Sequence, residues 1–244
     1  MKQYVDTLLV PHLKEVLTTE LSKEVVEKVL ECIRDLAEEM GPHCVEDHLE
    51  WIVSVIEDLL DKKALCQGKD IDVEEPEGDE RDEDEESEEE DEDDLDHDEL
   101  ILGNATDLVI ALSKCLQNSF LPCLQRLGPK LVRYLGEEHG KSDRIMVIGC
   151  LAETFNQCPA ALTVYFNDFM QVLFKHSTSD DGSLNRNVSY GMAICADKAS
   201  PEQFLPHLAN TLVAIKQMHT ASEEPDAKDN CLAAIVRILE RYRD

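Results

Sequence analysis

Basic residues are scarce in this chain. Its 244 residues include 23 lysines and arginines against 53 aspartates and glutamates, which gives a formal net charge of -30. A protein with this balance repels nucleic acid and anionic lipid and attracts basic partners. We therefore expect no direct nucleic-acid binding and a partner that carries positive charge.

Long hydrophobic runs are also absent. No window approaches the roughly eighteen apolar residues of a membrane-spanning helix, and residues 1–10 lack the basic flank and apolar stretch of a signal peptide. We expect no membrane insertion. The nine cysteines are scattered without any C-x-x-C spacing. This pattern predicts reduced thiols on apolar helix faces, as in cytosolic or nuclear proteins.

The sequence has little of what catalysis or cofactor binding requires. It contains neither nucleotide-binding glycine pattern, G-x-x-x-x-G-K-[ST] or G-x-G-x-x-G, and it lacks the calcium-loop spacing of an EF-hand. His43, Cys44 and His48 are close in sequence, but a helix opening there explains them without a metal. No acidic pair has the apolar surroundings that tune a catalytic pKa. We expect neither an enzyme nor a bound cofactor or metal.

What the sequence does contain is helical periodicity. Apolar residues recur at three- and four-residue intervals, as in the run from Val26 to Met40 and again from Leu49 to Leu60. No alternating stretch is long enough for a strand. The sequence therefore predicts an all-α protein.

The predicted helices come in pairs that repeat about every 42 residues. Leu124, Phe166 and Leu208 are 42 residues apart, as are Gly149 and Gly191. A two-helix unit of this length is typical of HEAT repeats, which stack because one pair cannot bury its apolar stripe alone. A helical bundle with chance spacing is the alternative. We expect a single α-solenoid of about five HEAT repeats, over residues 1–40, 42–118, 119–158, 159–199 and 201–244.

One segment, Asp70–Glu99, is almost wholly acidic, and we call it the acidic segment. Its thirty residues carry twenty-two carboxylates and one counter-charge, Arg81, so it holds -21 of the net charge and the rest of the chain -9. Such a sequence cannot collapse, and we expect a disordered insertion over residues 67–98 that joins the two helices of the second pair. A solvated insertion that only aids solubility is the alternative.

Two sets of residues are candidates for partner contact. Second helices of stacked pairs usually line a concave face, although a solvated face would carry the same residue types. The electrostatic set lies in the acidic segment: Asp79, Glu80, Asp82, Glu83, Asp84, Glu85, Glu86, Glu88, Glu89, Glu90, Asp91, Glu92, Asp93 and Asp94. The second-helix set is Asn104, Asp107, Glu153, Asn187, Tyr190, Asp229 and Asn230. Ser87, followed by three glutamates, matches an acidophilic-kinase pattern and is a candidate phosphosite.

Several stretches resemble a known family. They are NRNVSYGMAICADKASPEQFLPHLANTLVAIK at 185–216, AKDNCLAAIVRIL at 227–239, FLPCLQRLGPKLVRYL at 120–135 and DRIMVIGCLAETFNQCP at 143–159. They are similar to later repeats of nuclear transport receptors of the karyopherin-β (importin-β) superfamily, in particular of the importin-four type. The likeness is good over 98–244 and looser over 1–66. An acidic loop between two helices of one repeat is also typical of this superfamily.

The resemblance implies a function. Importin-four-type receptors carry basic proteins, notably histones and ribosomal proteins, and shuttle between cytoplasm and nucleus through the pore. The family's receptors are about four times longer, so the chain resembles a central-to-C-terminal portion. Their early Ran-GTP surface has no counterpart here. Ran-GTP and nucleoporin repeats would be partners of a full-length receptor.

Two other functions fit the same sequence. A HEAT-repeat scaffold would bind a structured partner through its helix ridges, with the acidic segment incidental. A histone-chaperone-like protein would use acidic shielding without transport. The leading prediction is an import receptor segment that binds basic cargo through its second helices and its acidic segment.

Overall fold

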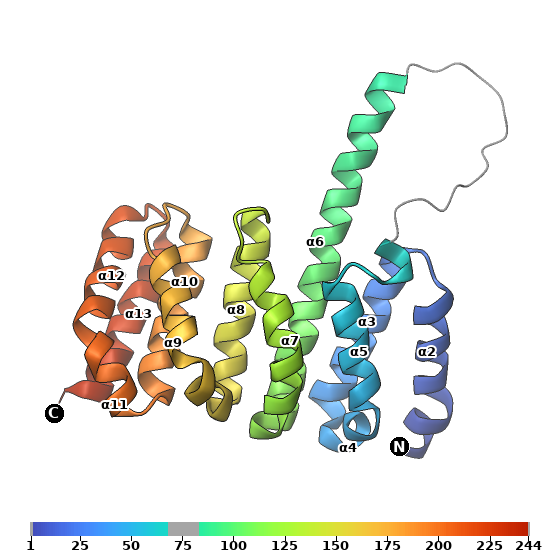
Figure 1. The fold of residues 1–244 in the computed structure, drawn as a ribbon, viewed down its shortest axis with the longest axis horizontal. Helices are drawn as coiled ribbons and strands as arrows, with labels where there is room; N and C mark the ends of the chain where they lie inside the picture. Colours follow the sequence, from blue (N-terminus) through green and yellow to red (C-terminus); the bar gives the residue numbers. More distant parts are fainter. Residues whose placement is uncertain (1, 68–82, 244) are drawn as a thin grey trace. The chain divides into compact units, whose positions relative to one another are not determined.

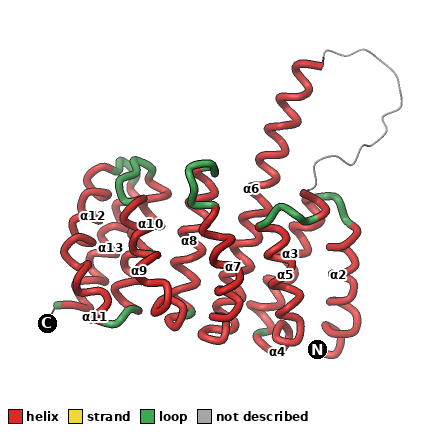
Figure 2. Tube along the Cα trace, viewed as in Figure 1, coloured by secondary structure: helices red, strands yellow, loops and turns green. Residues whose placement is uncertain are grey.

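The structure is a computed structural model that describes residues 2–67 and 83–243, without the side chains of residues 83–98. All regular structure in these ranges is helical, and no strand occurs in them (Figure 1, Figure 2). The predicted all-α class with paired helices is confirmed. The chain divides into two compact units, Met1–Ala111 and Leu112–Asp244. The prediction of one continuous array over five fixed ranges stays a prediction.

Unit 1 begins with short helical pieces and ends within a long helix. Its elements are α1 (Lys2–Tyr4), the π-helix η1 (Val5–Leu9), α2 (Val10–Thr19), α3 (Lys23–Met40), α4 (Pro42–Val45), the 3-10 helix η2 (Glu46–His48), α5 (Leu49–Leu60), the 3-10 helix η3 (Leu65–Gln67) and α6 (Glu83–Leu116). Ser22 caps α3 by accepting the Val25 N–H. Gly41, at a φ of 75°, ends α3 in a conformation that glycine favours, and Pro42 starts α4.

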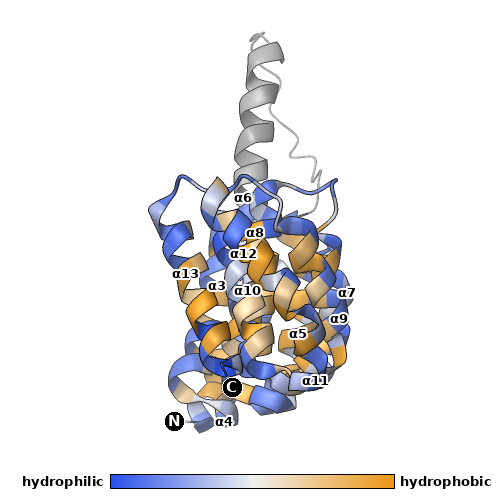
Figure 3. Ribbon diagram, turned by 90° about the vertical axis from the view of Figure 1, so that its left-hand side faces the viewer, coloured by the Kyte–Doolittle hydropathy of each residue, from blue (hydrophilic) through white to orange (hydrophobic). Residues whose placement is uncertain are grey.

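Unit 2 consists of three successive helical pairs. Its elements after α6 are the 3-10 helix η4 (Gln117–Phe120), α7 (Leu121–Arg133), α8 (Lys141–Gln157), α9 (Pro159–His176), α10 (Gly182–Lys198), α11 (Pro201–Phe204), the 3-10 helix η5 (Leu205–His207), α12 (Leu208–Ala221) and α13 (Pro225–Tyr242). The second helix of the middle pair, α10, packs between the second helices α8 and α13 (Figure 1). Hydrophobic and hydrophilic residues alternate along these helices (Figure 3), which is the pattern of stacked amphipathic pairs.

The repeat markers occupy close-packed positions in unit 2. Leu124 and Phe166 are each 1% exposed, although Leu208 is only half-buried. A Cβ at Gly191 would lie 2.8 Å from the Leu173 Cδ2 atom, so α10 approaches α9 too closely for a larger side chain without movement. The 42-residue spacing thus marks core and contact positions of successive pairs.

The predicted insertion is corrected at its C-terminal end. The acidic composition predicts an insertion that extends to residue 98, but α6 begins at Glu83. Glutamate is a good helix former, and carboxylates near a helix N-terminus interact favourably with the helix dipole. Acidic composition therefore does not exclude helix in this part of the chain. The earlier part of the predicted insertion, residues 68–82, lies outside the described residues.

Candidate functional site

Three polar side chains meet on the second helices of unit 2. The Tyr190 hydroxyl, on α10, donates to Glu153 Oε1 on α8 at 2.7 Å. Asn156 Nδ2, one turn further along α8, donates to the Tyr190 oxygen at 3.3 Å. Two of the predicted contact residues, Glu153 and Tyr190, are therefore brought together, and all three side chains are half-buried.

Only one of the three hydrogen-bonded side chains is charged. Burial raises the pKa of Tyr190, and its hydrogen bond to Glu153 raises it further, although the Arg237 guanidinium on α13 opposes this. The phenol therefore stays protonated and acts as a donor, so the carboxylate of Glu153 supplies the charge. Two turns further along α10, the Asp197 carboxylate is compensated by Arg237 at 3.8 Å and Lys198 at 3.3 Å.

Asn156 and Arg237 are cluster members that the sequence analysis did not select. Asn156 follows Glu153 by three residues and therefore shares its helix face. That spacing was available in the sequence. The contribution of Arg237 depends on the packing of α13 against α10, for which the sequence gives no direct signal.

Asn187, another predicted contact residue, has a structural role. Its Nδ2 atom donates to the Ile145 carbonyl oxygen on α8 at 2.8 Å, across an interval of 42 residues. It also faces Gly149, where a Cβ would lie 2.9 Å from Asn187 Nδ2. The glycine and the asparagine together allow this close approach of α8 and α10.

Replacing Asn187 with alanine is expected to lower the free energy of unfolding by about 1 kcal/mol, since it removes one hydrogen bond between two helices. Chemical denaturation followed by far-ultraviolet circular dichroism measures the change. Asn230→Ala is the matched control, because Asn230 Nδ2 donates only to the Asp226 carbonyl of its own helix. A loss no larger for Asn187→Ala than for Asn230→Ala would contradict this role.

The remaining second-helix candidates are peripheral. Asp229 is exposed on α13, one residue before Asn230. In unit 1, Asn104 Nδ2 donates to the Leu100 carbonyl of its own helix at 2.9 Å. Asp107 is exposed and lies 3.7 Å from Arg34 on α3. An exposed ion pair of this kind contributes little to stability.

The electrostatic set lies largely beyond the described side chains. Asp79, Glu80 and Asp82 fall outside the described residues. Residues 83–94, and Ser87 with them, belong to the backbone of α6, and their side chains are not described. Their role in partner binding stays a prediction.

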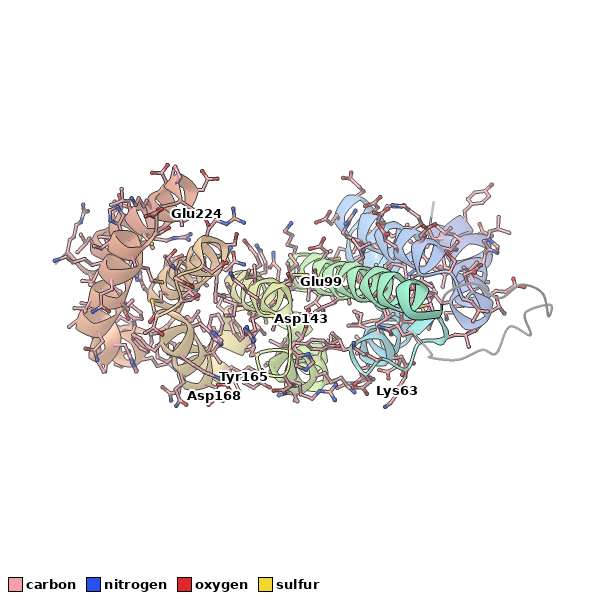
Figure 4. The ribbon with its side chains drawn as sticks, turned by 90° about the horizontal axis from the view of Figure 1, so that it is seen from above. Lys63, Glu99, Asp143, Tyr165, Asp168 and Glu224 are labelled. Carbon is pink, nitrogen blue, oxygen red and sulfur yellow. The ribbon has the colours of Figure 1, made fainter. Side chains whose placement is uncertain are left out.

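A surface groove in unit 2 was not predicted. It has a volume of about 260 Å³ and lies between α7, α8 and α9. Gly128 and Pro129 of α7 line it. Tyr165 and Asp168 of α9, which are labelled in Figure 4, also line it. All of the remaining lining is aliphatic or aromatic: Leu124, Val132, Leu151, Phe155, Phe169 and Val172. The sequence feature that could have indicated the groove is Pro129, a proline inside a helix.

The described residues contain no group of three or more histidine, cysteine or acidic side chains placed to hold a metal ion. His48 Nε2 lies 2.8 Å from Asp6 Oδ1, on η1. All nine cysteines are free thiols, and burial raises the pKa of the Cys195 thiol. Among the described helices, none is both long and apolar enough to cross a bilayer.

Comparisons with known proteins point to one family. Residues 25–137 match the family described as importin repeat 6. The chain is 25% identical to the probable importin subunit beta-4 of Schizosaccharomyces pombe over 144 residues. These residues are 59% of this chain and 13% of the relative. It is also 25% identical to human importin-4 over 237 residues. These residues are 95% of this chain and 20% of the relative.

The chain thus spans a fifth or less of the length of these relatives. The family match covers most of α3, the second predicted helical pair and the start of the third pair. The similarity to human importin-4 extends over almost the whole chain, in keeping with the paired helices of both units. These similarities support a place for the chain in the karyopherin-β (importin-β) superfamily, with the importin-four type as its relatives.

Proposed function

We propose that this chain is a segment of a nuclear import receptor that binds basic proteins, such as histones or ribosomal proteins. The observation that carries the proposal is the acidic segment, which concentrates -21 of the net charge of -30 within the second helical pair. Two relatives named as importins support the receptor class. In a longer receptor, Ran-GTP and nucleoporin repeats are further partners, and the protein shuttles between cytoplasm and nucleus.

The binding surface in this proposal combines a long-range and a short-range component. The acidic segment attracts a cationic chain from a distance and raises the rate of encounter. The second helices then offer fixed carboxylates, with Glu153 oriented by Tyr190 and Asn156. The second-helix candidates Asp107 and Asp229 are exposed carboxylates on α6 and α13. Arginine and lysine side chains are the complementary groups.

The test is binding of the whole chain to a lysine- and arginine-rich peptide of histone-tail composition. We expect the dissociation constant, measured by fluorescence anisotropy, to rise by about tenfold or more between about 50 and 300 mM salt, because the Debye length shortens over this range. An uncharged peptide of the same length is the control. An affinity independent of salt would contradict the electrostatic account.

A second measurement separates the receptor from its alternatives. A receptor segment that contacts the pore binds phenylalanine-glycine nucleoporin repeats, whereas a histone chaperone has no use for them. If basic peptides bind while these repeats do not, this chain acts as a chaperone or contains no pore contact of its own. Partner capture that is unchanged without the acidic segment favours a scaffold.

A further inference from the structure

The connection between α9 and α10 lies beside a cationic depression. This open depression, of about 460 Å³, is lined by the turn before α8, the first turn of α8, the end of α9 and the connection itself. Its ionised lining consists of three cations, Lys141, Arg144 and Lys175, and two carboxylates, Glu137 and Asp180. Three cations this close together stand out on a chain whose net charge is -30.

The three cations differ in how they are engaged. The Lys141 ammonium pairs with Asp181. Arg144 Nη1 donates to the Gly136 and His139 carbonyl oxygens at 3.2 and 2.8 Å. These two bonds fix the guanidinium and use the donors of one of its three nitrogens. Lys175 is exposed and makes no ion pair with any described residue.

The pKa of a neighbouring histidine is affected by the same cations. His176 lines the same depression. Burial lowers the pKa of His176, and the charges of Lys175 and Arg144 lower it further. Its Nε2 atom is buried and has no hydrogen-bond partner among the described residues. The charges of Lys175 and Arg144 therefore add to burial in disfavouring a further cation here.

The connection carries three hydroxyls in a row, and only one is exposed without a local bond. Ser177 Oγ donates to the Phe174 carbonyl oxygen at 2.9 Å. Ser179 Oγ accepts the Asp181 N–H at 3.1 Å. Thr178, between them, is exposed, lines the depression and makes no hydrogen bond to any described residue. Asp180 and Asp181 follow it at the second and third positions, which is an acidophilic-kinase pattern like that of Ser87.

We propose that Thr178 is a phosphorylation site and that its phosphate pairs with Arg144 and Lys175. An acidophilic protein kinase supplies the phosphoryl group from ATP. The Thr178 oxygen forms a bond to the γ-phosphorus, the bond from that phosphorus to ADP breaks, and the hydroxyl proton leaves to the base of the kinase. The product carries about two negative charges and three acceptor oxygens beside a guanidinium and an ammonium.

Phosphorylation changes the local charge and links two parts of unit 2. The phosphate adds about two negative charges beside Arg144 and Lys175, and it joins the α9–α10 connection to the first turn of α8. The closing experiment does not involve basic cargo, so its result is independent of the proposed transport function.

The experiment uses the whole chain with Ser87→Ala, which removes the candidate acceptor of the acidic segment, together with ATP and an acidophilic kinase. We expect a phosphoryl group at Thr178, located there by fragmentation mass spectrometry. Adding Thr178→Ala abolishes its incorporation. Ser177→Ala and Ser179→Ala, the matched controls, leave it in place. Absence of phosphate from Thr178 overturns the proposal.

A second readout tests the partners of the phosphate. Nearby cations stabilise the dianion, so phosphorus-31 NMR should show a second ionisation of phosphothreonine 178 below its ordinary pKa of about 6. In a variant carrying Arg144→Gln and Lys175→Gln, the pKa should return towards that value. An ionisation that is ordinary in the parent chain, or unchanged in the variant, overturns the pairing.

Discussion

Replacing Phe166 with alanine is expected to lower the free energy of unfolding by about 3–5 kcal/mol, because the change leaves a cavity in a packed interior. Phe166 lies near the middle of α9 and is 1% exposed. Its ring packs edge-to-face on His207 of η5, with centroids 5.6 Å apart. The side chain therefore joins the first helices of two successive pairs. Urea denaturation followed by circular dichroism measures the loss.

Val164→Ala is the control for this experiment. Val164 lies on the same helix but is 58% exposed, so its truncation should change the free energy of unfolding by no more than about 0.5 kcal/mol. Equal losses for the two variants would show that the centre of α9 is not part of a close-packed core. The same result would contradict the explanation of the 42-residue spacing by core packing.

Much of the fold follows from local sequence features. Apolar residues at helical spacing predict α3, α5 and α7 to α10, and proline or glycine marks most of their ends, as at Gly41 and Pro159. A repeat period is visible because each pair uses the same positions for its core. Leu124 and Phe166 are buried for that reason. These signals depend on residues near one another in the chain.

Features that depend on distant contacts were not accessible in this way. The sequence identifies Asn187 as a polar residue on a second helix, but only the packing of α10 on α8 shows that its side chain bonds to Ile145. The groove beside Pro129 likewise needs three helices to form it. The start of α6 at Glu83 was missed for another reason, since charge repulsion was weighed without the helix propensity of glutamate.

Neutralising residues 79–94 of the acidic segment is expected to have the largest effect on partner binding. In this variant each Asp and Glu from 79 to 94 becomes Asn or Gln, which keeps side-chain size while removing charge. At about 50 mM salt the affinity for a lysine- and arginine-rich peptide should fall by about tenfold or more, mainly through a slower association rate. Stopped-flow fluorescence measures the association and dissociation rate constants separately.

The matched control exchanges every Asp for Glu and every Glu for Asp over the same residues, which preserves charge and changes its order. This control should bind the peptide as the parent chain does, and circular dichroism should show whether α6 keeps its helicity in both variants. The difference in peptide affinity between the neutral variant and the parent chain should become smaller at about 500 mM salt, because charges are then screened within a few ångströms. Equal association rates at low salt would remove the acidic segment from the binding mechanism. Binding would then rest on the second helices, with Glu153, oriented by Tyr190, as the first residue to replace.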